Sequence, residues 1–288
     1  MQLSSLHIYP VKSGRVIDVD TANVEFLGLQ NDRRWVVVEA VKDENGKAIN
    51  RFISQRSHPQ LAQLIAIPKN DILHLSYAGA HFDLNLETAV CDQLISVWKD
   101  DFPAAIYEGA VNHWLSEQLG GTFRLASFGP ATQRRRESFM RDVAFDVSFA
   151  DGYPVLIATQ ASLEAVNIYV TAKGEAALPM SRFRPNIVIG GEGSLAWIED
   201  SWKRIKIGDV IFDCVKPCTR CIMTTLDPDS GESRENIALD ALTHLRRSGD
   251  KRLKGVLFGV NAIPLNEGRI TKGDKLEVLE IQTPWEIA

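Results

Sequence analysis

The sequence predicts an α+β protein dominated by strands, and three observations lead to this prediction. Short segments with alternating or β-branched residues, separated by turn residues, recur in the first third of the chain and again toward the C-terminus. Only three segments show the apolar spacing of a helix. The 288 residues, 45% of them hydrophobic, are enough for two packed domains of ordinary globular composition.

The first domain is expected over residues 1–125 as a β-barrel-like set of strands. Its strand pattern begins with alternation at residues 3–13, and residues 33–41 are rich in β-branched side chains. The pair Asn45-Gly46 suits the turn of a hairpin. Further strands are expected at residues 60–68, 72–79 and 81–86.

The second domain is expected over residues 126–288, with strands and a few helices. The polar stretch 131–154 is predicted to be a loop near the domain boundary. A hairpin is predicted at the turn Gly208-Asp209, and another turn at Gly273-Asp274. Apolar residues at helical spacing predict the three helices of the chain, at residues 110–120 with a glycine end, at 159–172, and at 235–249 ending at Gly249.

Composition and charge exclude several function classes. A net charge of −5 and a pI near 5.7 argue against non-specific nucleic-acid binding. The N-terminal residues show neither a basic region nor an apolar core of a secretory signal. No apolar run approaches the ~20 residues that span a bilayer. We therefore expect a cytoplasmic protein without a membrane segment.

The cysteines form an unusual cluster. Cys91 stands alone, whereas Cys214, Cys218 and Cys221 lie within eight residues at the spacing C-x3-C-x2-C. Three crowded thiols in a chain without an export signal indicate chemistry or metal binding before disulfides.

Two multi-cysteine interpretations fit the chain poorly. Radical enzymes that hold a four-iron cluster use this spacing before an α/β barrel, but only 67 residues follow Cys221. A structural zinc site needs four ligands, and the chain has no second ligand pair, since His244 stands alone. Cys214 also belongs to an alternating apolar run, which predicts a small buried residue rather than a ligand.

A third interpretation uses the single thiolate of Cys221. Arg220 precedes it and Lys216 is near, and positive charge favours the thiolate form that a nucleophile or a soft metal ligand requires. The following residues 222–226 are predicted to form a strand that holds the sulfur. An exposed structural cysteine is the alternative that these residues alone leave open.

The segment 217–231, with the pattern P-C-x-R-C-x-x-T-T-x-D-P-x-S/T-G, resembles the MOSC family, named for the C-terminal domain of molybdenum-cofactor sulfurases. The resemblance is closest to the branch of the mitochondrial amidoxime-reducing component and its bacterial relatives, and it implies a MOSC N-terminal β-barrel followed by a MOSC-type β-barrel domain. It extends in order through YPVKSG, NDRRW, SQR, FADGYP, FRPNIVI, EDSW, IGD and LFG, at residues 9–14, 31–35, 54–56, 149–154, 183–189, 199–202, 207–209 and 257–259.

The resemblance implies a molybdenum cofactor and a set of residues that hold it. In the family, one protein cysteine ligates the metal beside the two sulfurs of a pterin. Cys221 matches that ligand, which is also the catalytic position, while the role of Cys218 stays open. Cationic and amide side chains bind the pterin and its phosphate; the matching positions are Lys12, Ser13, Arg33, Arg184, Asn186 and Arg220, with Arg56 as an addition.

Simpler interpretations of several of these residues stand beside the functional one. Lys12 and Ser13 also fit an exposed turn, and Arg33 fits a solvated charge cluster. Pro185 extends the backbone before it and sets two polar side chains beside an apolar strand, which favours a site. Asp227 to Gly231 is predicted to be a turn, and Arg134–Arg136 a solvated loop that is able to dock an acidic electron donor.

The function implied is reduction of small N-hydroxylated compounds such as amidoximes and hydroxylamines. No cysteine follows Cys221, so the plant-type ferredoxin domain carried by many bacterial relatives is not expected. Electrons are then expected from a separate ferredoxin-, flavin- or cytochrome-type protein. The alternatives are a persulfide sulfur carrier and a cofactor-binding or storage protein in molybdenum-cofactor metabolism.

Overall fold

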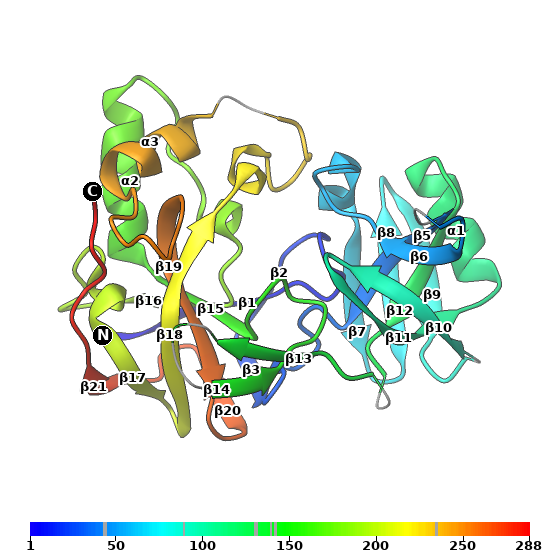
Figure 1. Cartoon of the computed structure of the whole chain (residues 1–288), viewed down its shortest axis with the longest axis horizontal. Coiled ribbons are helices and arrows are strands. Elements are labelled where there is room, and N and C mark those ends of the chain that lie inside the picture. The colour runs from blue at the N-terminus through cyan, green and yellow to red at the C-terminus, as the bar shows by residue number, and fades with distance from the viewer. Residues whose placement is uncertain (43–44, 89, 130–131, 139, 141–142, 234–235) are drawn as a thin grey trace.

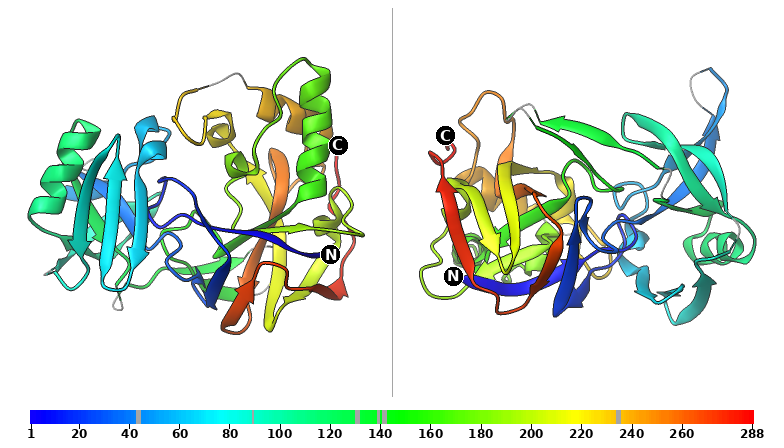
Figure 2. Two further views of the ribbon diagram at one scale, coloured as in Figure 1. Left: turned by 180° about the vertical axis from the view of Figure 1, so that it is seen from behind. Right: turned by 90° about the horizontal axis from the view of Figure 1, so that it is seen from below.

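The computed structural model of the chain describes residues 1–288 except positions 43–44, 89, 130–131, 139, 141–142 and 234–235. Strands dominate the described residues, which contain three α-helices. Two lobes lie side by side, and the chain crosses between them more than once (Figures 1 and 2). The predicted strand-dominated α+β class is confirmed.

The lobe at the right of Figure 1 contains a closed five-stranded barrel, as the sequence predicts. Its strand β5 (Trp35–Lys42) is rich in β-branched residues, and Val36, Val37 and Val38 are all fully buried. The hairpin expected at Asn45-Gly46 is present, because Lys42 pairs with Ala48; positions 43–44 lie outside the described residues. The barrel strands are β5 (Trp35–Lys42), β6 (Ala48–Phe52), β10 (Val90–Val97), β11 (Asp100–Tyr107) and β12 (Phe123–Ser127).

A three-stranded antiparallel sheet and one helix cover this barrel. The helix α1 (Ala110–Leu119) buries Trp114, Leu115 and Leu119, and it ends at Gly120, whose φ of 72° is the left-handed value of a glycine cap. The predicted first helix is therefore confirmed. The sheet consists of β7 (Ile65–Lys69), β8 (Ile72–Tyr77) and β9 (Ala80–Asn85).

The other lobe is built on an eight-stranded sheet that curls back on itself. Near its two ends the sheet closes on itself: Gln2 in the second strand forms a bridge with Lys275, which precedes the last strand, and the Leu3 N–H donates to Asp274 O at 2.8 Å. A small sheet of β3 (Thr21–Glu25), β4 (Gly28–Leu29) and β20 (Gly268–Thr271) flanks it. The main order is β2 (Ile17–Val19), β1 (Gln2–Ile8), β16 (Ile187–Gly190), β15 (Val155–Thr159), β19 (Val256–Pro264), β18 (Val210–Arg220), β17 (Trp202–Ile207) and β21 (Leu276–Ile281).

The N-terminal strands thus belong to the sheet of the C-terminal lobe. β1 pairs antiparallel with β16, and β3 pairs with β20. Because β2 and β3 follow in the same lobe as β1, residues 9–14 extend to the junction, where Val11 forms a bridge with Trp35, and then turn back. The chain enters the barrel only at β5. A boundary between residues 125 and 126 stays a prediction.

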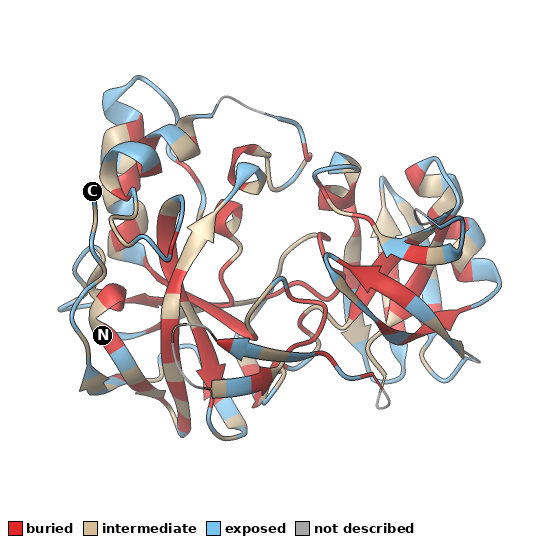
Figure 3. Ribbon diagram, viewed as in Figure 1, coloured by how far each residue is buried: buried red, intermediate tan, exposed pale blue. Residues whose placement is uncertain are grey.

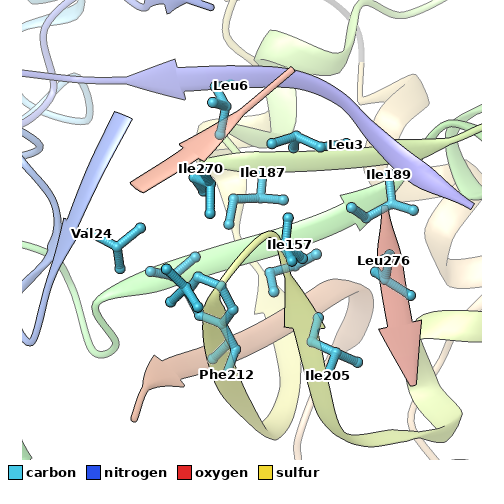
Figure 4. Close-up of a cluster of buried hydrophobic side chains, with 14 of the residues drawn as sticks. Leu3, Leu6, Val24, Ile157, Ile187, Ile189, Ile205, Phe212, Ile270 and Leu276 are labelled. Atoms are coloured by element: carbon cyan, nitrogen blue, oxygen red, sulfur yellow. The ribbon is translucent and has the colours of Figure 1, made fainter. Parts of the chain in front are cut away.

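The main core fills the inside of the curled sheet (Figure 4). Leu3, Ile157, Ile187 and Phe212 point toward one another there from four strands. In β18 the alternating residues Val210, Phe212 and Cys214 are all fully buried, as the sequence predicts. Figure 3 shows buried residues in red, and they fill the interior of each of the two lobes.

Two helices cover one side of the curled sheet. α2 (Gln160–Ala172) starts at Thr159, whose side chain accepts the Ser162 N–H, and α3 (Ile237–Leu245) packs against it through Leu242. The prediction that the third helix ends at Gly249 is wrong. The chain leaves the helix after Leu245 because Arg247 and Ser248 form bridges with Val256 and Ile287. Among the described residues, no helix has the length and apolar character needed to cross a bilayer.

The expected loop at 131–154 contains two short paired strands, β13 (Arg135–Ser138) and β14 (Val143–Asp146). Arg135 and Arg136 lie in β13 and not in the predicted loop, and of the three arginines at positions 134–136 only Arg135 is exposed. Arg134 is buried, and it forms an ion pair with Asp100 and donates to the carbonyls of Ser148 and Ala150. This partner set is not visible in the sequence, because Asp100 lies in the barrel.

A buried carboxyl group lies between α2 and the sheet. Glu199, in the short 3₁₀ helix η3 (Ile198–Ser201), is fully buried and accepts hydrogen bonds from the hydroxyls of Ser162 and Thr159. Burial raises the pKa of Glu199 to about 7, because it disfavours the charged form more than these hydrogen bonds favour it. The group therefore loses its proton in the folded state only near neutral pH.

Replacing Glu199 by Gln should remove part of the pH dependence of stability. The folded pKa of about 7 lies above the ordinary value of 4.5, so the native state retains the proton and is favoured at low pH. This stabilisation, about 3 kcal/mol, is lost as pH rises from 4.5 to 7. Urea unfolding at pH 5 and pH 8 should show a smaller pH difference for Glu199→Gln than for the unmodified chain. The exposed Glu164→Gln serves as control, and equal pH differences in all three proteins would contradict the assignment.

Candidate functional site

A cavity of about 490 Å³ lies where the two lobes meet. The barrel lobe contributes Phe52, Arg56 and Trp98, and the end of β18 forms another wall. All of the residues singled out in the sequence line it, although they come from segments far apart in the chain: Lys12, Ser13, Arg33, Arg56, Arg184, Asn186, Arg220 and Cys221.

Cys221 follows the last residue of β18, and its side chain is exposed. The Arg56 guanidinium donates from Nη2 to Cys221 Sγ at 3.0 Å, and it lies 4.7 Å from the ring centre of Trp98. Arg56 belongs to the loop after β6, so a cation from one lobe meets a thiol from the other. The contact therefore requires that the loop after β6 and the end of β18 are both in place.

The cation expected beside the Cys221 sulfur was Arg220, and this expectation is wrong. Arg220 instead donates from Nη1 to Cys218 Sγ at 3.0 Å and from Nη2 to the Phe183 carbonyl at 2.8 Å. Successive residues of an extended strand point to opposite sides, which separates Arg220 from the sulfur that follows it. The cation at the Cys221 sulfur is Arg56, 165 residues away in sequence.

The residues after Cys221 form a 3₁₀ helix, η4 (Ile222–Thr225), and not the predicted strand. Two hydroxyls explain the turn: Thr224 Oγ1 donates to Cys221 O at 3.0 Å, and Thr225 Oγ1 donates to Ile222 O at 2.8 Å. These side-chain bonds compete with sheet pairing. The sulfur is therefore held at a strand-to-helix corner.

The three clustered thiols do not meet at one point. Cys214 is fully buried in the hydrophobic core, whereas Cys218 and Cys221 line the cavity. Within the part of the chain that is described, no group of three His, Cys, Asp or Glu side chains is arranged to hold a metal ion. This geometry favours the interpretation with one thiolate.

A buried tyrosine organises two of the arginines. The guanidinium carbons of Arg33 and Arg184 lie 4.5 Å and 4.1 Å from the ring centre of Tyr9. Burial raises the pKa of Tyr9 to about 12 even though both arginines oppose the shift. Burial also lowers the pKa of Arg184 to about 10, an effect that Tyr9 partly offsets. Both guanidinium groups are charged at neutral pH.

Asp32 and Asn186 fix the position of Arg33. Asp32 is buried, and its carboxylate accepts from Arg33 Nη1 at 2.5 Å and from the Tyr9 N–H at 2.8 Å. Asn186 Oδ1 accepts from Arg33 Nη1 at 3.1 Å and from the Leu156 N–H at 3.1 Å. Asn186 thus holds a cation as well as lining the cavity.

Lys12 and Ser13 do not form an exposed turn, since only 5% and 8% of their surfaces are accessible. Lys12 Nζ donates to the Phe149 carbonyl at 2.8 Å and forms an ion pair with Asp151. Burial lowers the pKa of Lys12, and Asp151 offsets part of this shift. The turn interpretation failed because residues 9–14 run through the junction between the lobes.

Trp98 and Asp151 are cavity residues that the sequence did not assign. Trp98 Nε1 donates to Asp151 Oδ1 at 2.9 Å. Partial desolvation in the cavity opposes ionisation of Asp151, whose side chain is 70% exposed, but Lys12 and the indole N–H outweigh this effect and lower its pKa. Asp151 lies within FADGYP, one of the motifs that resemble the MOSC family, so the sequence marks its segment. Trp98 follows a barrel strand and lies in none of these motifs.

Unusual backbone conformations gather at the cavity. Eight described residues other than glycine have positive φ, and four of them line the cavity: Ser13, Arg33, Trp98 and Arg184, with φ of 65°, 51°, 60° and 53°. Such conformations cost about 1 kcal/mol or more and cluster at functional sites. Here they aim three large side chains and a turn into one space.

The residues present fit a compact anionic group with a soft metal. Cys221 offers one accessible sulfur, and guanidinium groups bind phosphate with paired N–H donors. The buried Arg220 Nε has no hydrogen-bond partner among the described residues, so one donor of this cation is left for a ligand. The cationic wall consists of Lys12, Arg33, Arg56, Arg184, Lys216 and Arg220.

Comparison with known proteins agrees with this geometry. Residues 144–277 match the MOSC domain, and residues 1–122 match the MOSC N-terminal beta barrel domain. Human mitochondrial amidoxime-reducing component 1 is 31% identical over 96% of this chain and 82% of its own length. The chain belongs to the MOSC family. Other relatives in the family comparison are bovine mitochondrial amidoxime reducing component 2, at 30% identity over 85% of this chain and 72% of its own, and rice molybdenum cofactor sulfurase, at 28% over 96% and 35%.

Removal of the Asp32 carboxylate should destabilise the fold strongly. Asp32→Ala leaves Arg33 and the Tyr9 N–H without their buried acceptor, and the loss of one partner of a buried pair costs about 3–5 kcal/mol. Asp229 offers a matched control, because its 68% exposed carboxylate pairs with Arg15 at the surface. Asp229→Ala should cost less than about 1 kcal/mol. Similar losses for the two variants in urea unfolding would count against this role for Asp32.

Proposed function

We propose that this MOSC-family protein is a molybdenum-cofactor-dependent reductase of small N-hydroxylated compounds. One observation carries the proposal. The exposed Cys221 sulfur opens into a cavity walled by cations, where an anionic pterin and its metal would fit. The similarity to the amidoxime-reducing components supports the choice of substrate class.

In this proposal the Cys221 thiol and the cations of the cavity have separate physical roles. Cys221 ligates the metal through its thiolate, a soft ligand suited to such a centre. Arg184 and Arg220 provide guanidinium donors for the phosphate and polar edges of the pterin, because their forked N–H groups match phosphate oxygens. Lys12 and Arg33 add positive charge that favours the anionic cofactor, and their own partners keep them in place.

When bound, the molybdenum cofactor supplies two-electron redox chemistry, so that an N-hydroxyl group plus two electrons and two protons gives an N–H group and water. The chain supplies the opening and the orientation. Arg56 is hydrogen-bonded to the Cys221 sulfur and lies over Trp98. Its side chain therefore occupies the space immediately beside the thiol that would ligate the metal. Electrons come from a separate carrier protein.

Metal analysis of protein from a molybdenum-replete host tests the proposal directly. We expect about one molybdenum per chain in the unmodified protein and loss of the metal in Cys221→Ser, because one protein sulfur completes the ligand set. Cys91→Ser is the matched control, since Cys91 lies on β10 outside the cavity lining. The loaded protein should also consume a hydroxylamine or an amidoxime with a reduced dye as donor.

Other outcomes separate the remaining functions. Molybdenum bound at Cys221 without any reductase turnover favours a cofactor-binding or storage protein. Cyanide-labile sulfur on Cys221 without molybdenum overturns the reductase assignment and favours a persulfide carrier, a function to which the similarity with the rice sulfurase points.

Cofactor retention should depend on Arg220, a half-buried arginine of the cavity wall. Arg220→Gln removes a charge-assisted donor, and hydrogen bonds to charged groups contribute about 1.5–3 kcal/mol, so the pterin affinity should fall by about tenfold or more. Arg135→Gln removes an arginine whose side chain is 61% exposed and serves as control. Pterin content, measured as fluorescent oxidised pterin per chain, checks the difference. Equal content in the two variants would be inconsistent with a role for Arg220 in binding.

A further inference from the structure

The segment that joins α3 to β19 carries a concentration of positive charge (Figure 1). Residues 246–254, the basic loop, contain five Lys or Arg residues and one Asp. Its net charge is therefore +4, in a chain whose net charge is −5. The cavity uses none of these side chains.

Arg246 at the start of the basic loop is buried and pairs with Asp200, whereas the other four cations are exposed on an anchored backbone. Arg247, Lys251, Arg252 and Lys254 are exposed, whereas Leu253 is buried. The Gly249 N–H donates to Glu286 O at 2.8 Å, and the Leu253 N–H donates to Asp250 O at 3.0 Å. Arg252 pairs with Asp250, which leaves three exposed cations that this carboxylate does not neutralise.

The basic loop also lies close to the Cys221 end of β18. Arg247 forms a bridge with Val256, and Val256 is the register partner of Arg220. Neighbouring strands lie about 4.8 Å apart, so the Arg247 backbone lies about 10 Å from that of Arg220. Arg220 directly precedes Cys221. A protein bound on the loop is separated from the site by little more than the end residues of β19 and β18.

The neighbouring C-terminal tail adds apolar surface to the charged loop. Ser248 bridges to Ile287, and the Ala288 N–H donates to Arg247 O at 2.9 Å. Arg252 lies 6.0 Å from the ring centre of Trp285, which is half-buried. Arginine and aromatic side chains are enriched at protein interfaces, and Arg252 beside Trp285 is such a pair.

We propose that the basic loop is the docking surface for an acidic redox protein that delivers electrons to the site. The proposal rests on the proposed reductase function. Complementary charge steers such a carrier onto the loop and raises its association rate. The short path from Arg247 through Val256 to Arg220 favours an electron carrier over an anionic membrane, for which closeness to the thiol has no use.

A charge-reversal pair with a matched control tests the proposal. K251E/K254E reverses two exposed lysines of the loop, and K272E/K275E reverses two exposed lysines near the turn between β20 and β21. Both change the net charge by the same amount. With an acidic plant-type ferredoxin as probe at low ionic strength, K251E/K254E should raise the Kd on the order of tenfold, and K272E/K275E should leave it nearly unchanged.

Turnover separates this proposal from the proposed function. Ferredoxin-driven reduction should fall in K251E/K254E, while reduction driven by methyl viologen stays equal to that of the unmodified chain. Absence of viologen-driven turnover in the loaded, unmodified protein removes the reductase function, and the binding measurement still decides the docking site. Equal Kd values for the two double variants overturn the docking proposal. So does failure of the unmodified chain to bind either an acidic ferredoxin or an acidic flavodoxin, or binding to phosphatidylserine vesicles alone that K251E/K254E abolishes.

Discussion

The buried carboxylate of Asp32 is the constraint on which the cavity depends. It accepts the Tyr9 N–H and pairs with Arg33, and Tyr9 in turn lies against both Arg33 and Arg184. Guanidinium groups placed this close repel one another, and burial weakens their hydration. One carboxylate and one aromatic ring hold the pair together, and the excess of positive charge that remains makes the cavity receptive to an anion.

The junction of the lobes follows from the way the chain is threaded. Because β1 and β2 pair in the C-terminal sheet before the barrel starts, residues 9–14 form a loop that reaches the junction and brings Lys12 to Asp151. The loop after β6 then brings Arg56 to Cys221. Each lobe alone holds only part of the cavity wall, so the site is a product of how the lobes meet, and its positive-φ residues are held by contacts from both sides.

Charged side chains are concentrated in separate regions of this protein. The cavity concentrates cations around the thiols of Cys218 and Cys221, and the basic loop presents further cations to solvent near the same end of β18. Glu199 lies apart from both as an uncharged acid at low pH. A net charge of −5 therefore conceals two positive surfaces. The absence of non-specific nucleic-acid binding, which this charge favours, stays a prediction.

The sequence by itself determined the strand-dominated class, the first helix with its glycine end, the buried position of Cys214 and the set of residues that meet at the cavity. These follow from local periodicity, turn chemistry and family motifs. Only the tertiary structure decided that Arg56 reaches the Cys221 sulfur, that Arg134 is buried, that the third helix stops at Leu245 and that residues 222–225 turn into a 3₁₀ helix. Most of these outcomes depend on partners distant in sequence, and the turn after Cys221 depends on two threonine hydroxyls that bond to the backbone instead of a sheet.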